Sequence, residues 1–120
     1  IEPIKYKKVN VESCNNLIKL SKIYFPNLIF IFTSSTTVFG PTKFSNQLVD
    51  LNHPVVATSN YTLHKIICEN SLRNSCLNWI ILRCSAIMNP KFRPSKEMTK
   101  FGLNISTETC VEPVHIEDVT

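Results

Sequence analysis

The stretch L-I-F-I-F-T-S-S-T-T-V-F-G, residues 28–40, decides the fold of this chain. Its first part, residues 28–32, is a continuous apolar run with β-branched and aromatic members, which is typical of a parallel strand buried on both faces. Five hydroxyl side chains follow at residues 33–37, and Gly40 ends the stretch. A strand that served only the core would normally end in a turn, so the hydroxyl run indicates a site at the end of this strand.

Helical and strand patterns lie on either side of this stretch. Residues 9–24 show the spacing of an amphipathic helix, which Pro26 stops. Its apolar face carries Val11, Cys14, Leu17 and Ile18. Residues 40–60 contain Gly, Pro, Ser and Thr without a helical period, and indicate a long loop. A second helix is expected at residues 61–72, and a second buried strand at residues 77–82.

The order helix, strand, loop, helix, strand predicts an α/β fold. Such alternation favours crossover connections and a parallel sheet with helices on both faces. Ligands of such sheets bind beyond the carboxyl ends of the strands, where residues 33–37 are expected to lie. On the second helix, Tyr61 and Lys65 are one helical turn apart and share a face. A phenol, an ammonium and a hydroxyl can therefore converge at this edge of the sheet.

Composition argues against several classes of function. With 120 residues and 43% hydrophobic content, the chain amounts to about one domain or a piece of one. Its net charge of +4 comes from 13 basic and 9 acidic residues spread along the chain, so we expect no nucleic-acid partner. The longest apolar runs are far shorter than the roughly 20 residues that span a bilayer, so we expect no membrane segment.

The five cysteines indicate reduced thiols in a cytoplasmic protein, because their number is odd and no C-x-x-C pair occurs. Three of them recur every eight residues: Cys68, Cys76 and Cys84. No histidine lies near them at the spacing of metal ligands, so we expect these thiols to pack in the protein and expect no metal site.

Five ordered segments carry a resemblance to a known family. They are V-N-V-E-S-C-N-N-L (9–17), F-T-S-S-T-T-V-F-G (32–40), Y-T-L-H-K-I-I-C-E (61–69), L-N-W-I-I-L-R (77–83) and P-V-H-I-E-D-V (113–119). Together they resemble the short-chain dehydrogenase/reductase superfamily, in the extended branch that includes NAD-dependent epimerases and dehydratases. The middle segments are similar to the family motifs S-S-x-x-V-Y-G and Y-x-x-x-K.

The resemblance implies a partial Rossmann-like fold. Residues 1–90 would be the C-terminal half of a doubly wound, dinucleotide-binding domain, and residues 91–120 would begin a segment on the substrate side. The family's first strand and its G-x-x-G-x-x-G turn have no counterpart here. With only Gly40 and Gly102, the chain cannot build a glycine loop around a pyrophosphate. We therefore expect a fragment of a longer protein, which would bind NAD or NADP when intact.

The resemblance also assigns residues to roles. Ser35, Tyr61 and Lys65 would be catalytic: Tyr61 moves a proton, Ser35 hydrogen-bonds the reacting oxygen, and Lys65 also holds the nicotinamide ribose. Further cofactor contacts would come from Asn10, Ser34, Cys84, Ser85, Ala86 and Ile87. Thr36 and His115 would face the substrate, although a core role for His115 is an equal alternative. Asn10 more readily bridges backbone groups than takes part in chemistry.

The resemblance leaves two alternative functions. The first is an NAD(P)-dependent oxidoreductase, epimerase or dehydratase that acts on a hydroxyl or carbonyl carbon of a small molecule, with a sugar or nucleotide-sugar as a candidate. The alternative is a non-catalytic or truncated relative with a structural or interaction role. In that case the hydroxyls would only satisfy strand-end amides, and Tyr61 and Lys65 would be a surface pair. Because the second helix is apolar over more than one face, we also expect a homodimer of the intact protein.

Overall fold

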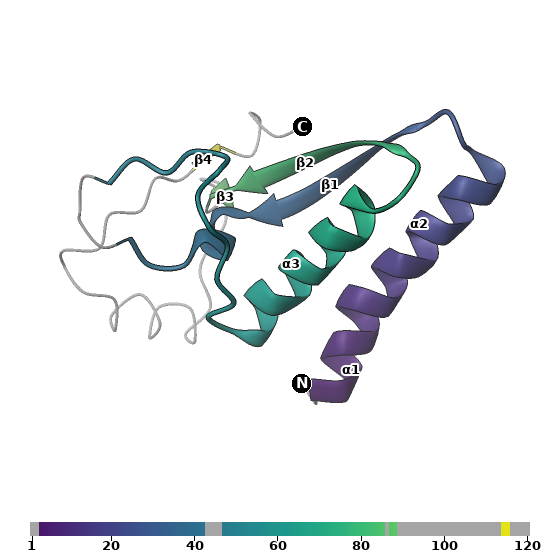
Figure 1. The fold of residues 1–120 in the computed structure, drawn as a ribbon. Helices are drawn as coiled ribbons and strands as arrows, with labels where there is room; N and C mark the ends of the chain where they lie inside the picture. Colours follow the sequence, from purple (N-terminus) through teal and green to yellow (C-terminus); the bar gives the residue numbers. More distant parts are fainter. Residues whose placement is uncertain (1–2, 43–46, 86, 89–113, 116–120) are drawn as a thin grey trace.

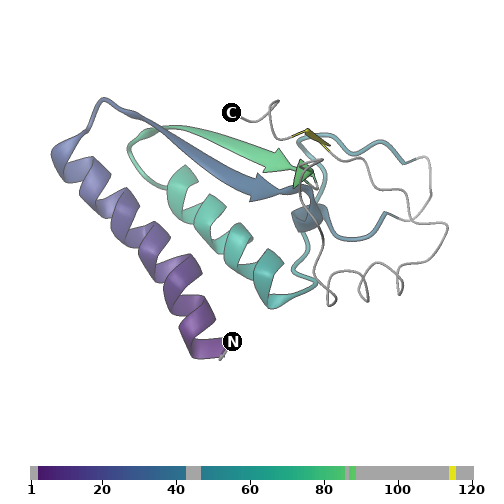
Figure 2. The same ribbon diagram turned by 180° about the vertical axis from the view of Figure 1, so that it is seen from behind.

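The structure, a computed structural model, describes residues 3–42, 47–85, 87–88 and 114–115. In this part of the chain, strands β1 (Ile29–Ser35) and β2 (Asn78–Cys84) form a parallel sheet. The N-terminal helix and helix α3 (Asn60–Arg73) run side by side along one face of that sheet in both views (Figure 1, Figure 2). The predicted order of elements and the parallel α/β architecture are therefore confirmed.

The N-terminal helix changes its winding part-way along. Helix α1 (Pro3–Lys7) passes into the π-helical segment η1 (Lys8–Glu12), which continues as α2 (Ser13–Tyr24). At the end of η1, the N–H of Ser13 donates to the carbonyl of Lys8, five residues back, as a π-helix requires. Such wide turns often occur at functional sites, and this one carries Asn10.

The inner face of this helix follows the predicted spacing except at one position. Val11, Cys14 and Ile18 are buried, whereas Leu17 is 57% exposed. The prediction for Leu17 was wrong because this residue lies on the flank of the face, where no described residue covers it. Leu20 on the same helix and Leu63 on α3 are also exposed. These side chains leave apolar surface on both helices, and the expected homodimer stays a prediction.

Strand β1 is longer than its apolar run. It pairs with β2 in register from Ile29 opposite Asn78 to Ser35 opposite Cys84. Residues 33–35 therefore belong to the strand and do not follow it, because the parallel ladder with β2 continues to Cys84. The hydroxyl run still lies at the carboxyl end of the strand, and residues 36–39 turn away as a short 3-10 helix, η2.

Only one face of this sheet is covered by the described helices. Phe30, Phe32 and Ile81 pack against a core of Val11, Cys14, Ile18, Cys68, Leu72 and Leu77. On the other face, Ile29 and Ile31 are about 60% exposed (60% and 59%), and Ile80 and Leu82 also reach the surface. The expectation that these strands are buried on both faces is therefore wrong for the described residues, since both helices pack on the same side.

The remaining connections agree with the sequence pattern. Residues 40–42 and 47–59 contain neither helix nor strand, as expected for the long loop. Beyond β2, the short strands β3 (Ile87–Met88) and β4 (Val114–His115) pair in parallel. Most of the predicted substrate-side segment, residues 91–120, lies outside the described residues. None of the helices described is long and apolar enough to cross a membrane.

Candidate active site

The start of α3 is fixed one residue before Tyr61. The hydroxyl of Ser59 accepts a hydrogen bond from the N–H of Thr62 (3.2 Å), and the hydroxyl of Thr62 accepts one from the N–H of Ser59 (2.9 Å). This reciprocal capping box satisfies two amides that the first helical turn leaves free. Helix α3 therefore begins at Asn60, and Tyr61 and Lys65 lie in its first two turns.

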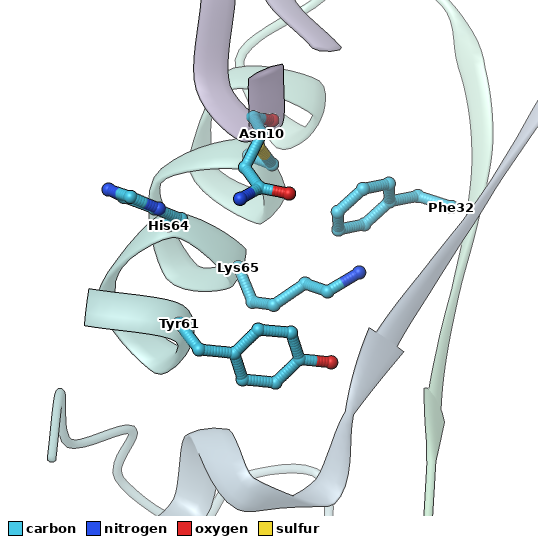
Figure 3. Close-up of a pocket in the computed structure, with 6 residues that line it drawn as sticks. Asn10, Phe32, Tyr61, His64 and Lys65 are labelled. Atoms are coloured by element: carbon cyan, nitrogen blue, oxygen red, sulfur yellow. Dashed lines mark hydrogen bonds between the residues drawn. The ribbon is translucent and has the colours of Figure 1, made fainter. Parts of the chain in front are cut away.

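Lys65 reaches from α3 to the carboxyl end of β1. Its ammonium donates a hydrogen bond to the Thr33 carbonyl at 2.7 Å, over a sequence separation of 32 residues. The nitrogen also lies 4.9 Å from the centre of the Phe32 ring and 5.7 Å from that of Tyr61. Figure 3 shows the Tyr61 and Lys65 side chains lying next to each other, both directed from α3 toward the strand. The predicted convergence of a phenol and an ammonium at this edge is present.

Ser35, the last residue of β1, has its hydroxyl in a local network. It accepts a hydrogen bond from the N–H of Thr37 at 3.2 Å and lies 2.9 Å from the Thr37 hydroxyl. The Ser35 side chain thus caps η2, which is the local role that the alternative interpretation predicted for these hydroxyls. Thr36 is exposed. Of these two predicted residues, the half-buried Ser35 ends β1, and Thr36 begins η2.

A small pocket lies between the two helices and the sheet. It is lined by Asn10, Phe32, Tyr61, His64, Lys65 and Cys68 (Figure 3). Its volume is about 30 Å³, against roughly 300–1,000 Å³ for pockets that enclose small ligands. Asn10, predicted as a cofactor contact, donates its side-chain amide to the carbonyl of Tyr6 at 3.0 Å. This is a bridge between backbone and side chain within the helix, which the sequence analysis favoured for Asn10.

Residues 1–111 match the family model of the NAD dependent epimerase/dehydratase family. The chain belongs to this family. No curated protein matches the chain. The predicted resemblance to extended short-chain dehydrogenases/reductases is thus confirmed at the level of the family.

Two solved structures resemble this member of the family. One is a short-chain dehydrogenase/reductase superfamily protein from Agrobacterium tumefaciens with bound NAD, with a TM-score of 0.60 and 25% identity. The other is the UDP-Glc/GlcNAc 4-epimerase from Campylobacter jejuni, with a TM-score of 0.69 and 20% identity, which shows the shared fold. The matches cover 73% and 98% of this chain, which spans 28% and 44% of the respective structures. The Rossmann-like fold class is confirmed.

An ion pair that the sequence pattern did not predict lies beside the site. The buried carboxylate of Glu69, on α3, accepts two hydrogen bonds from the Arg83 guanidinium on β2, at 3.0 and 2.7 Å. Arg83 also lies over the ring of Phe39, 4.6 Å from its centre. Both residues stand in segments that carry the family resemblance: Glu69 ends the segment 61–69, and Arg83 ends the segment 77–83. The sequence shows only a glutamate on the second helix and an arginine on the following strand, 14 positions apart. The two side chains meet because the chain folds back from α3 to β2.

Ser34 lies beside this ion pair. The residue is only 5% exposed and its hydroxyl makes no well-formed hydrogen bond in the described structure. It is nevertheless close enough to help lower the pKa of Glu69. Burial raises the pKa of this carboxyl, but hydrogen bonds from Arg83 and the contact with Ser34, together with the charges of Arg83 and Arg73, bring it below its ordinary value of 4.5. Ser34, predicted as a cofactor contact, thus faces the interior.

The other predicted site residues lie along β2 and beyond it. Cys84 is the last residue of β2, where its thiol contacts the Leu82 carbonyl at 3.8 Å. Ser85 follows half-buried, and Ile87 in β3 is 46% exposed. Ala86 lies outside the described residues, and for His115 the structure describes only its backbone in β4. In the part of the chain described, no group of three or more His, Cys, Asp or Glu side chains is placed to hold a metal ion.

Proposed function

We propose that this chain carries the Ser35, Tyr61 and Lys65 set of an NAD(P)-dependent oxidoreductase, epimerase or dehydratase that acts on a hydroxyl-bearing or carbonyl carbon. Membership of the NAD dependent epimerase/dehydratase family supports the general class. The observation that carries the proposal is that Lys65, with Tyr61 alongside it, bonds the carboxyl end of β1 at Thr33. Thr33 is two residues from Ser35 on the same strand. In parallel sheets this is the edge where ligands bind.

Tyr61 is the residue in this set that can exchange a proton with substrate. It is 41% exposed, so the phenol is accessible to a ligand from outside. Oxidation of a carbinol requires that the hydroxyl proton leave as the carbon loses hydride, and reduction requires the reverse. The ammonium of Lys65, 5.7 Å from the ring centre, stabilises negative charge that develops on the oxygens during this transfer.

Ser35 has the position of a hydrogen-bond partner for the reacting oxygen. Its oxygen lies 2.9 Å from the Thr37 hydroxyl, and when Thr37 is the donor of that pair, the single proton of Ser35 is free to be donated to a ligand. Such a donor would hold the substrate oxygen beside Tyr61. In the absence of substrate, the same hydroxyl serves as the cap of η2.

The donor set at this edge fits the ribose of a nicotinamide dinucleotide. An ammonium and a phenol are both hydrogen-bond donors that suit vicinal hydroxyls. Lys65 and Tyr61 would hold the ribose, and Asn10 would support the wall behind them through its bond to Tyr6. When bound, NAD or NADP would supply the chemistry of hydride acceptance and return. The roles of Cys84 to Ile87 as further contacts are part of this proposal.

A sugar or nucleotide-sugar is the proposed substrate. The support is the fold shared with a UDP-Glc/GlcNAc 4-epimerase, over 44% of that structure. The test is an assay of the intact protein expected above, with NAD⁺ and either UDP-Glc or UDP-GlcNAc, with the products resolved by chromatography and the bound nicotinamide followed by its absorbance. Conversion of either sugar, or reduction of the nicotinamide, supports the proposal. Binding of NAD⁺ without any turnover of either probe counts against these substrates, and failure to bind NAD⁺ or NADP⁺ counts against the enzyme class.

A further inference from the structure

Two buried cysteines belong to the core that the N-terminal helix and α3 share. Cys14 on α2 is 8% exposed and Cys68 on α3 is 2% exposed, and both belong to the same core cluster. The Cys68 thiol donates to the backbone carbonyl of Asn10 at 3.3 Å, one helical turn before Cys14. This bond places the Cys68 sulfur against the turn that carries Cys14, although 54 residues separate the two cysteines in sequence (68 minus 14).

We propose that Cys14 and Cys68 form a redox-sensitive thiol pair that hydrogen peroxide converts into a reversible disulfide between α2 and α3. Neither thiol takes part in the proposed transfer of proton and hydride. Where thiols are normally kept reduced, a disulfide is usually transient and either catalytic or redox-sensing. The proposed bond between Cys14 and Cys68 would be of the redox-sensing kind.

The two thiols differ in pKa, and this difference assigns a role to each. The neighbouring Cys68 side chain lowers the pKa of the Cys14 thiol to about 7, against the opposing effect of burial, and the charge of Lys65 assists. The neighbouring Cys14 side chain, together with burial, raises the pKa of Cys68 above its ordinary value. Since the thiolate is the nucleophile, Cys14 is the attacking residue and Cys68 the resolving one. Cys14 is also the more exposed of the two.

The reaction balances with peroxide as the oxidant. The Cys14 thiolate attacks one peroxide oxygen, the O–O bond breaks, and protonation of the leaving hydroxide gives water and a sulfenic acid on Cys14. The Cys68 sulfur then attacks the Cys14 sulfur, the S–O bond breaks, and a second water leaves as the disulfide forms. The two sulfurs lose two electrons in total, and peroxide gains them.

The disulfide would act on the wall of the pocket. Cys68 lines the pocket together with Tyr61, Lys65 and Asn10. Oxidation removes the thiol proton that Cys68 donates to the Asn10 carbonyl, and it ties α2 to α3 by a covalent bond at the same point. The state of the pair would therefore be coupled to the position of the π-helical turn that carries Asn10.

Peptide mapping tests the pair directly. The full chain is treated under native conditions with hydrogen peroxide, alkylated with iodoacetamide and digested with trypsin. Cleavage after Lys8, Lys19, Lys65 and Arg73 puts each cysteine alone in its peptide, residues 9–19 and residues 66–73. We expect these two peptides to be recovered as the main disulfide-linked product, and dithiothreitol to release both.

Matched variants complete the test. Cys76→Ser removes an exposed thiol outside the helix interface and should leave the cross-link intact. Cys14→Ser should abolish it and leave Cys68 alkylated. Recovery of both native peptides as separate alkylated species after oxidation would overturn the proposal. A cross-link to Cys76 that forms as readily as the one between Cys14 and Cys68 would overturn it as well, because it would show that oxidation does not follow the native contact.

Discussion

Lys65 donates its ammonium to the backbone carbonyl of Thr33 at 2.7 Å, which ties the middle of α3 to the carboxyl end of β1. The donor is charged, so the bond is stronger than a neutral one. It also fixes where the ammonium lies relative to the proposed ribose and the Tyr61 ring. One side chain thus serves both the packing of helix on strand and the proposed site.

Lys65→Met is expected to lower the stability of the fold, the affinity for NAD⁺ and the rate of turnover. Methionine keeps most of the aliphatic volume but loses the charge and the bond to Thr33. We expect a loss of about 1.5–3 kcal/mol in the free energy of unfolding, the usual range for hydrogen bonds to charged groups. In the intact protein, binding of NAD⁺ and turnover should both fall. Urea denaturation and calorimetric titration measure the two effects, with Lys19→Met on the exposed side of α2 as the control. Unchanged stability and unchanged NAD⁺ affinity would contradict both roles.

In the intact protein, Tyr61→Phe should remove nearly all turnover and leave the fold unchanged. Phenylalanine fills the same space next to Lys65, but it cannot exchange a proton. General acid–base catalysis contributes roughly 10²–10⁴-fold, so kcat should fall within that range while the affinity for NAD⁺ changes little. Steady-state kinetics with UDP-Glc as the probe measures the loss, and Tyr24→Phe, on the exposed end of α2, is the matched control. Retention of more than about a tenth of kcat would show that Tyr61 is not the acid–base group.

The sequence predicted the elements well because their signals are local. The spacing in residues 9–24 and the stop at Pro26 gave the first helix, and the apolar runs gave both strands. Two errors share one cause: the pattern shows which residues are apolar but does not show what covers them. Leu17 and Ile31 are apolar and exposed, since the described helices cover one face of the sheet and one stripe of each helix.

The candidate site was only partly accessible from sequence. Tyr61 and Lys65 share a helix face by simple periodicity, so their proximity could be predicted. The bond from Lys65 to Thr33 and the pair of Glu69 with Arg83 depend on the register between α3 and the strands, which tertiary packing sets. Local patterns contain no information about that register.

Gly40→Ala should destabilise the turn after the hydroxyl run. Gly40 has φ 69° and ψ −170°, a region that only glycine adopts readily. An added Cβ would also lie 3.3 Å from the Cβ of Val56, in the loop that bonds back to Val38. We expect a cost of about 1–3 kcal/mol, measured by urea denaturation. Thr42→Ala, an exposed position in the same loop, should change stability by less than about 0.5 kcal/mol. Equal stability of the two variants would show that the loop relaxes around Gly40.

Breaking the buried pair of Glu69 and Arg83 should be among the most destabilising single changes. The side chains are 3% and 11% exposed, so Arg83→Met leaves the Glu69 carboxylate buried without its bidentate partner. The expected loss in the free energy of unfolding is about 3–5 kcal/mol.

The double variant Glu69→Gln, Arg83→Met should lose less stability than the sum of the two single variants, because neither charge is left alone. Arg73→Ala, which removes a 43% exposed partner at 3.6 Å, should cost no more than about 1 kcal/mol. Additive losses in the double variant would rule out coupling between Glu69 and Arg83.

Acid should weaken the fold through Glu69 in a defined pH window. The pKa of this carboxyl in the folded protein lies below its ordinary value of 4.5, since the opposing effect of burial is outweighed by the hydrogen bonds from Arg83, the contact with Ser34 and the nearby positive charges. A carboxyl with a depressed pKa contributes stability that is fully present above its unfolded pKa and is lost as the pH falls through the folded one. The free energy of unfolding should therefore decrease as the pH drops from about 4.5 toward the lowered pKa of Glu69.

Urea denaturation at a series of pH values checks this, with Glu69→Gln as the comparison. Glutamine cannot titrate, so the variant should be less stable at neutral pH and should lose less stability over the same window. Parallel curves for the two proteins would mean that other carboxyl groups dominate the acid response.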